Sequence, residues 1–407
     1  TLSGKQHFVG PDLLHGFEER LVPELYPTDF SWTPSWGEER MSSNNTATGV
    51  TRSGIVRRTV QIDHDEAVFY HAKNKLHQFA REDSAPFFLN ASFIHPHEPY
   101  CTLQEYWDLY RHENIELPNT PLQPESEREF HTTRMLYHAM LVDTGISEEH
   151  VRIARHAYLG NVSYFDEMVG GLMKTLEQTG LLANTVVVIS ADHGDMLGEH
   201  GLWYKKHFFE DCIRVPLIIH WPERFSAGRH SQPASLIDLL PTLCDLAEIV
   251  PDEVAPEPLD GSSLLGACEG QMRDEDTPVF AEITSEGVPS PMFMVRKGKH
   301  KLMSGGGAPS VLYDLERDPH ELINLAHDAT RHEILDELEG LVRRQWDSER
   351  LNEQVLVSQR QRRLVHAAHE VGKTPAWEHQ SEDLADYWIH RDSEGYNDWA
   401  WKGISEV

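Results

Sequence analysis

The 407-residue sequence has few cysteines and no long apolar run, and each shortage excludes a class of protein. Its four cysteines, Cys101, Cys212, Cys244 and Cys268, show neither the close pairing of a metal site nor the density of a disulfide framework. A reducing compartment is the simpler interpretation, and we expect a cytoplasmic protein. No apolar stretch approaches the ~18 residues of a membrane span, so no membrane partner is expected.

Positive charge is also scarce. The sequence holds 36 lysines and arginines against 66 aspartates and glutamates, which gives a formal net charge of −30. Because such a mean field repels polyanions, we expect no nucleic-acid partner. Hydrophobic residues make up 39% of the chain, which is enough to build a core and argues against wholesale disorder.

The first 250 residues alternate between apolar runs and helical patterns. Residues 86–95, 184–190 and 215–221 are typical of buried strands, because they are apolar without strict alternation. Between the first two, apolar residues recur at steps of three and four over 151–172, and Gly180 is a plausible terminator of that helix. This alternation predicts an α/β fold with a largely parallel sheet and helices on both faces.

The pattern changes after residue 250. A connector rich in proline and acidic residues leads to three shorter strand-like pieces at 278–283, 291–303 and 311–315. A long charged helix is expected from about residue 331 to residue 365. We therefore divide the chain into an α/β domain over 1–250 and a smaller α+β subdomain over 251–407.

Charged residues gather where the strand at 184–190 ends. Asp192, His193 and Gly194 follow Ser190 directly, and the carboxyl ends of strands are where ligands collect in an open α/β sheet. A carboxylate oxygen beside an imidazole suits a divalent ion such as Ca²⁺, Mn²⁺ or Mg²⁺. The alternative for this tripeptide alone is a capped turn with solvated side chains.

Other cationic residues follow further strand ends and turns. His95 and His97 come after the strand at 86–95, Lys5 and His7 lie in a short polar turn, and Lys205 follows the Asp-His pair. Lysines and histidines grouped around a metal can each donate to a different oxygen of a tetrahedral oxyanion. We interpret His95 as a structural residue at the end of its strand.

Several polar neighbours of this segment are expected to be structural. Lys206, His200 and His207 are interpreted as solvated or supporting residues. Glu210 and Arg214 are expected to form an ion pair near the strand at 215–221.

Longer motifs carry a family resemblance. The stretches "ADHGDMLGEHGLWYKKHFFEDCIRVPLIIHWP", "SLIDLLPTL" and "LYDLERDPHELINLA" resemble the sulfatases of the alkaline-phosphatase superfamily. The stretches "SGKQHFVGPDLLHGFEERL", "YPTDFSWTPSW" and "RRLVHAAHEVGKTPAWEHQ" are similar to the choline sulfatases within that family. The resemblance covers almost the whole chain and implies a three-layer α/β/α sandwich, a bound divalent metal with Ca²⁺ favoured, and a homo-oligomer.

The resemblance also assigns roles to matching positions. It implies that Asp192 and His193 are metal ligands and that His97 binds the sulfate or protonates the leaving oxygen. It further implies that Lys205 holds sulfate oxygens and that Lys5 and His7 flank the nucleophile.

The substrate's other end is expected to be choline. A quaternary ammonium is best held by an aromatic face and a carboxylate. Trp32 resembles the family's aromatic wall, and Glu282 matches its acidic position, with Glu286 a weaker candidate. Loop packing for Trp32 and a surface charge for Glu282 are the alternatives. The family's tail carries an aspartate that reaches a neighbouring subunit, and here Asp383 matches only after a shift of one residue.

The nucleophile of the family is missing. Sulfatases convert a Cys or Ser within Cys/Ser-x-Pro-x-Arg to formylglycine, and this sequence contains no such motif. The family's paired-aspartate metal ligands are absent as well. We expect the nucleophile and the first strand of the sheet to belong to a missing N-terminal segment. The chain as given would then be inactive, with an open apolar groove and an unpaired strand edge.

Three functions remain open from the sequence. The leading prediction is hydrolysis of a small sulfate ester, choline-O-sulfate, to the alcohol and sulfate. The second is hydrolysis of a phosphonate or phosphate ester, since the Asp-His pair also occurs in phosphonate monoester hydrolases. The third is a non-catalytic module that binds an anion.

Overall fold

The computed structural model describes residues 1–25, 28–36, 46–82, 86–251, 255–372, 399–401 and 404–406. The helices in these ranges are α1 (Thr48–Thr51), α2 (Val60–Glu82), α3 (Gln104–Trp107), α4 (Phe130–His138), α5 (Glu148–Thr179), α6 (Glu210–Ile213), α7 (Leu239–Leu246), α9 (Leu265–Cys268), α10 (His332–Gln345) and α11 (Ser348–Val371). The strands are β1 (Leu2–Gly4), β2 (Gly54–Arg58), β3 (Asn90–Ser92), β4 (Cys101–Leu103), β5 (Val187–Ser190), β6 (Leu217–His220), β7 (Val279–Ile283), β8 (Met292–Lys297), β9 (His300–Gly305), β10 (Ala308–Asp314) and β11 (Ser405–Glu406). Single 3₁₀ turns join them, of which η1 (Phe30–Trp32) and η5 (Glu199–Gly201) matter below.

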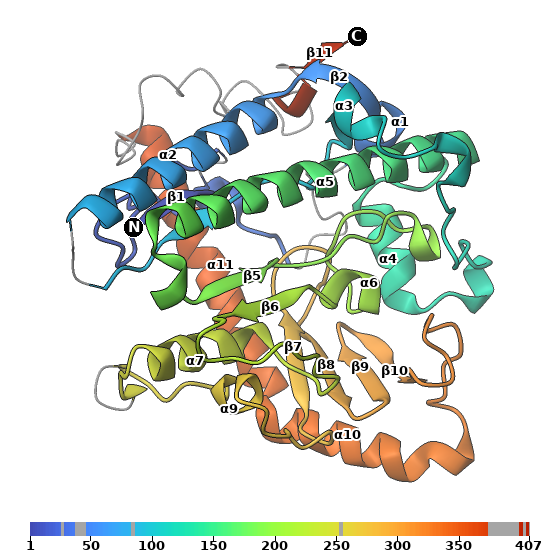
Figure 1. The fold of residues 1–407 in the computed structure, drawn as a ribbon. Helices are drawn as coiled ribbons and strands as arrows, with labels where there is room; N and C mark the ends of the chain where they lie inside the picture. The colour runs from blue at the N-terminus through green and yellow to red at the C-terminus, as the bar shows by residue number, and fades with distance from the viewer. Residues whose placement is uncertain are drawn as a thin grey trace.

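Two long helices, α2 and α5, run side by side across one end of the molecule (Figure 1). The helix predicted around 151–172 is confirmed as the core of α5. At its start, the Ser147 side chain accepts from the His150 amide, and the His150 ring accepts from the Ser147 amide, which closes a capping box. At its end, Gly180 adopts φ 74°, the left-handed conformation that terminates a helix at little cost for glycine.

The N-terminal strands form small separate sheets, and only some pairs are parallel. β1 pairs with β3 and β2 with β4 in parallel, as the alternation predicted. β5 and β6 are antiparallel, so the expectation of a largely parallel sheet is wrong for this pair. The chain leaves β5 and enters β6 at the same end of this two-stranded sheet, so no crossover is needed. The connecting segment carries part of the cluster described below.

The strands are less covered than their apolar sequences predicted. Every described residue of β3 and β5 is only half-buried, and Ile218 of β6 is 53% exposed. The expectation of buried strands at 86–95, 184–190 and 215–221 is therefore wrong for these cores. The apolar runs have the composition of a covered sheet, but the described residues cover them only in part.

The C-terminal region is built around one antiparallel sheet in the order β10-β9-β8-β7. The three predicted strand-like pieces are confirmed, and the middle one is the hairpin of β8 and β9. The single helix expected from 331 to 365 is instead two helices, α10 and α11. They part at Trp346, which takes an extended conformation and stacks on Phe293 of β8 at 4.6 Å between ring centroids. Asp347 then caps α11 by accepting from the Arg350 amide.

The main apolar cluster joins both regions. It contains Trp36 and Tyr100 from the N-terminal half, Phe209 from the segment after β5, and Tyr313 from β10. α11 begins beside the C-terminal sheet and runs behind the molecule to the N-terminal half (Figure 1). Across the described ranges, we find no helix with the length and apolarity to cross a membrane.

Candidate functional site

The structure brings Lys205 and His97 into direct contact. The Lys205 Nζ lies 3.0 Å from His97 Nε2, and the two residues are 108 positions apart. On the other side of the ring, His97 Nδ1 lies 2.9 Å from the Glu98 backbone oxygen and 2.9 Å from its carboxylate. Both Glu98 groups accept, so the ring hydrogen is assigned to Nδ1 and Nε2 accepts from Lys205. The His97 ring is thus held with its Nε2 facing Lys205, and these two residues begin the group called the cluster below.

Lys5 and His7 belong to the same cluster. Lys5 is buried, and its pKa is lowered first by burial and then by the charge of Lys205. Burial, reinforced by the charges of Lys5, Lys205 and a protonated His97, lowers the pKa of His7 to about 2. Two ammonium groups close together in a partly dehydrated place attract an anion and disfavour each other.

The loop that carries Lys5 and His7 is fixed by close packing of β1 on β3 and by two charged side chains. Gly4 has φ 99°, and a side-chain Cβ there would lie 2.1 Å from the Ser92 carbonyl oxygen, so β1 approaches β3 too closely for any other residue. Arg20 donates to the Gly4 carbonyl at 2.7 Å. The Glu24 carboxylate accepts from the His7 amide and from the amide before it, each at 2.7 Å.

A buried carboxylate also fixes the segment before His97. Asp65 of α2 is fully buried and accepts from the Ile94 amide at 2.8 Å and from the His95 amide at 3.0 Å. It also accepts from His95 Nδ1 at 2.7 Å, and the His95 ring lies edge-on to Tyr164 at 5.1 Å. His95 therefore serves the scaffold, as the sequence predicted.

Asp192 and His193 lie at the end of β5 beside this cluster. Asp192 Oδ2 lies 3.4 Å from His193 Nε2, and the centroids of the His193 and His97 rings are 6.4 Å apart. His193 Nδ1 donates to the Gly194 carbonyl at 2.8 Å, which leaves Nε2 with its lone pair. Burial, and then the charge of Lys205, lowers the pKa of His193 to about 4, so the ring is neutral at pH 7.

The pair has the right atoms for a metal but too few of them. A carboxylate oxygen and a neutral imidazole nitrogen converge at Asp192 and His193, which is the donor chemistry expected. Over the described ranges, no group of three or more His, Cys, Asp or Glu side chains is placed to hold an ion. A divalent cation needs more ligands than two, so these residues alone do not make a site.

Trp32 joins the cluster, whereas Glu282 does not. The Trp32 ring in η1 is half-buried and lies 6.1 Å from the His7 ring. Glu282 lies on β7 with an exposed side chain, and alternation places it opposite Ala281 and Ile283, which pack on the main core. No contact found in the described ranges joins Glu282 to Lys205 or His97. Asp383 lies outside the described residues.

Glu286, the weaker candidate for the choline site, forms an ion pair with Lys206. Its carboxylate lies 2.5 Å from Lys206 Nζ and 3.7 Å from His138 Nε2. Burial opposes ionisation of Glu286, but His138 and Lys206 lower its pKa to about 2. Lys206 is therefore turned away from the cluster and paired, although it follows Lys205 directly.

The other polar residues between β5 and β6 are structural, but Glu210 has a different ion-pair partner from the one that the sequence predicted. His200 and His207 each stack on Phe209, at 3.9 Å between ring centroids. Glu210 pairs with Arg296 at 3.1 Å and with Lys301 at 3.0 Å. The expected pair of Glu210 with Arg214 is wrong, because the buried Lys301 ammonium needs an anion and Arg214 is exposed.

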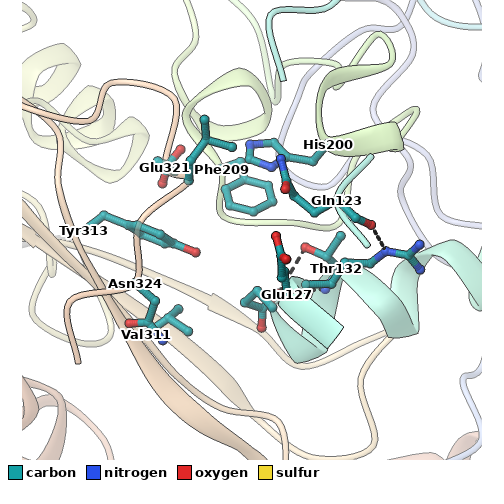
Figure 2. Close-up of a pocket in the computed structure, with 12 residues that line it drawn as sticks. Gln123, Glu127, Thr132, His200, Phe209, Val311, Tyr313, Glu321 and Asn324 are labelled. Atoms are coloured by element: carbon teal, nitrogen blue, oxygen red, sulfur yellow. Dashed lines mark hydrogen bonds between the residues drawn. The ribbon is translucent and has the colours of Figure 1, made fainter. Parts of the chain in front are cut away.

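A separate hollow of about 110 Å³ lies between α4, η5 and β10 (Figure 2). Its walls share no residue with the Lys205 cluster. Glu129 accepts from two amides at the start of α4, Glu321 accepts from the Glu210 amide at 2.7 Å, and Asn324 accepts from the Leu312 amide at 3.0 Å. These polar groups are committed to the framework, and we assign the hollow no ligand.

The buried Cys212 offers no nucleophile to the cluster. Cys101 and Cys212 are buried, and burial raises the pKa of the Cys212 thiol to about 11. A thiol with so high a pKa is protonated at neutral pH and unreactive. Neither residue stands in a Cys-x-Pro-x-Arg sequence.

Sequence reasoning missed the buried acids that hold the cluster. Glu24 lies in "VPELYP" and Glu98 in "PHEPY", and the proline beside each acid was the feature of the sequence that could have drawn attention to it. Asp65 lies in a polar helix and carries no such mark. Each acid acts on a backbone or ring of a residue already singled out, and only coordinates reveal that contact.

Family models match most of the chain. The model described as Sulfatase matches residues 22–249. The model described as N-sulphoglucosamine sulphohydrolase, C-terminal, matches residues 198–347. The model described as Choline sulfatase enzyme C terminal matches residues 353–387, which include most of α11.

Individual proteins agree with these models. The chain is 40% identical to a choline-sulfatase of Rhizobium meliloti over 93% of this chain and 75% of that protein. It is 30% identical to an arylsulfatase of Clostridium perfringens over 64% of this chain and 54% of that protein. The chain thus spans three quarters of the first relative and about half of the second.

A solved structure shows the same architecture. The phosphonate monoester hydrolase of Agrobacterium radiobacter is 25% identical, with a TM-score of 0.58 over 71% of this chain and 61% of that one. The predicted α/β fold of alkaline-phosphatase type is confirmed by this likeness.

Proposed function

The chain belongs to the sulfatase family, and from that premise we propose that it acts on a small sulfate ester, choline-O-sulfate, and releases sulfate and choline. The observation that supports this most is the convergence of Lys5, His7, His97 and Lys205 at one place beside Asp192 and His193. The likeness to a choline-sulfatase supports the choice of ester.

The two lysines supply the charge for the sulfate group. Lys5 is buried and Lys205 lies within the range at which it lowers the pKa of Lys5. A sulfate placed between them relieves their mutual repulsion and accepts from both ammonium groups. Such donors, fixed before the reaction, stabilise the charge that develops in the transition state.

The His97 and Lys205 pair can handle the proton that the leaving group needs. When the ester's S–O bond breaks, the departing oxygen gains negative charge and takes a proton. In the free protein one proton is held between Lys205 Nζ and His97 Nε2, at 3.0 Å. Glu98, on the far side of the ring, favours a protonated His97 against the effect of burial. An alcohol oxygen beside Nε2 would receive that proton.

Two parts of the family's chemistry are not assigned to described residues. A divalent metal, with Ca²⁺ favoured, would polarise the sulfate, and Asp192 and His193 supply two of the ligands it would need. The formylglycine nucleophile has no matching motif in the sequence. We derive no step through either group.

Trp32 is proposed to face the choline. Its ring stands beside His7 and therefore at the edge of the sulfate site. A quaternary ammonium cannot donate a strong hydrogen bond, and an aromatic face attracts it. An arylsulfate would contact the same ring by apolar packing alone.

A phosphonate or phosphate ester is the second candidate, and the likeness to the phosphonate monoester hydrolase favours it. The test compares three esters with protein expressed from its complete coding sequence: choline-O-sulfate, 4-nitrophenyl sulfate and a phenylphosphonate monoester. We expect the highest kcat/KM for choline-O-sulfate. Preferred turnover of the phosphonate ester would support the second candidate, and saturable binding without turnover would mean an anion-binding module.

A further inference from the structure

The C-terminal helix α11 reaches the segment that carries Trp32. The Gln359 Oε1 accepts from the Trp36 amide at 3.1 Å, and Arg363 Nη2 donates to the Pro34 carbonyl at 2.6 Å. These partners are 323 and 329 positions apart in the sequence. Figure 1 shows how α11 crosses from the C-terminal sheet to the N-terminal half.

Gln359 is an unusual residue for its place in α11. It is the one buried residue among those described in a helix that is otherwise half-buried or exposed. Its Oε1 is used by Trp36, and its Nε2 is buried with no hydrogen-bond partner in the described part of the chain. An apolar side chain would avoid that unsatisfied N–H, so the carbonyl contact is what the position provides.

The segment is also held at its other side. Trp36 is 6% exposed, and its Nε1 donates to the Ser285 carbonyl at 2.9 Å, in the loop that follows β7. Asp29 caps η1 by accepting from the Ser31 amide at 2.8 Å. With Trp36 and Pro34 anchored, the position of the Trp32 ring beside His7 is fixed from both ends of its segment.

We propose that Gln359 and Arg363 of α11 are positioning residues for substrate selectivity, because they fix residues 30–36 so that Trp32 stands over the non-sulfate end of the ester. The inference rests on the proposed function of Trp32. Both residues lie within the part of α11 that matches the choline sulfatase C-terminal model. The cluster of Lys5, His7, His97 and Lys205 is anchored by other residues. Changes in α11 should therefore weaken binding of the choline end of the substrate more than binding of its sulfate end.

The experiment uses Gln359→Leu and Arg363→Met in protein expressed from its complete coding sequence. Arg360→Met is a matched control at an exposed position of α11. Hydrogen exchange at the Trp36 amide measures the anchoring without reference to activity. Loss of one hydrogen bond predicts about fivefold faster exchange and an about fivefold higher KM for choline-O-sulfate in Gln359→Leu. We expect kcat, and the KM for 4-nitrophenyl sulfate, to change less than about twofold.

The outcomes separate the two proposals. Faster exchange with a selective rise in KM for choline-O-sulfate supports the inference. The Arg363 side chain is exposed, so Arg363→Met should fold and provides a second test of the same effect. Unchanged exchange at Trp36, or equal effects on both esters, overturns it. If the wild type hydrolyses neither ester, the proposed function fails, and the inference is then decided by choline affinity: an unchanged Kd in Gln359→Leu overturns it.

Discussion

Lys205 donates to His97 Nε2 at 3.0 Å, while the opposite nitrogen of the same ring faces the buried Glu98 carboxylate. The imidazole therefore stands between a cation and an anion, each from a different side. This arrangement fixes the direction of the ring and places a Lys205 proton at Nε2. Under the proposed function, a sulfate ester in that place would meet charge and a proton donor together.

Removal of the Lys205 ammonium should damage catalysis far more than folding. In Lys205→Ala we expect a loss of about 3 kcal/mol in transition-state stabilisation, roughly 100-fold in kcat, the scale for one lost oxyanion donor. Steady-state kinetics with choline-O-sulfate, on protein expressed from its complete coding sequence, measures it. Lys206→Ala is the matched control, because that ammonium is turned toward Glu286. A larger fall in kcat for Lys206→Ala than for Lys205→Ala would contradict the assignment.

Calcium should bind weakly if only the described residues supply its ligands. Asp192 and His193 provide two ligands where Ca²⁺ takes six to eight oxygens, so we expect a Kd of about 10⁻³ M or weaker. Isothermal titration calorimetry measures it, and Asp192→Asn should abolish the residual heat, with Asp108→Asn on the exposed surface as the control. Micromolar binding that survives Asp192→Asn would show that other residues hold the ion.

The stability of the protein should fall on mild acidification because of His7. Burial, with Lys5 and Lys205, holds its folded-state pKa at about 2, below the ordinary 6.5. The unfolded chain therefore binds the proton first, and the stability present above pH 6.5 is lost as pH falls toward 2. The slope from this residue is at most about 1.4 kcal/mol per pH unit.

Urea denaturation at pH 7, 6 and 5 tests the role of His7. The difference in unfolding free energy between pH 7 and pH 5 should shrink in His7→Asn. His15→Asn, at an exposed histidine, should leave that difference unchanged. If the two variants behave alike, His7 is not held in the neutral state.

Trp32→Ala should raise KM for choline-O-sulfate much more than for a neutral aryl sulfate, because only the first carries a cation for the ring to attract. We expect about a fivefold to tenfold difference, from the ~1 kcal/mol of an exposed cation–π contact. Glu282→Gln should change KM less than about twofold, since its side chain is exposed and apart from the cluster. A large, choline-specific effect of Glu282→Gln would restore that residue to the site.

Glu24 should be important for folding. It is fully buried, accepts two amides of the loop that carries His7, and lies 3.7 Å from the buried Arg20. Glu24→Ala leaves Arg20 without its counter-ion and should lower the unfolding free energy by about 3 kcal/mol. Glu19→Ala breaks a partly exposed pair with Lys75 and should cost less than about 1 kcal/mol. Similar midpoints in chemical denaturation for both variants would contradict this difference.

The long-helix pattern and the strand-end residues could be predicted because each depends on local sequence. The period of α5 and its Gly180 terminator are written within one stretch. Lys5, His97, Asp192 and Lys205 each follow a recognisable turn or strand, and the family motifs then name their roles. The break between α10 and α11 could not be predicted, because it arises when Trp346 stacks on Phe293, which is distant in sequence.

The sequence by itself determined the family, the α/β class and most of the residues that gather at the cluster, because motifs and periodicity are properties of short stretches. Only the tertiary structure decided which of two adjacent lysines faces the cluster, that Glu282 stands apart, and that Glu24, Asp65 and Glu98 hold it. The contacts of Lys205, Glu24 and Asp65 join atoms that are 108, 17 and 29 to 30 residues apart, and Glu98 reaches the ring of the residue beside it. Burial then sets the charge of each group, and burial belongs to the folded chain alone.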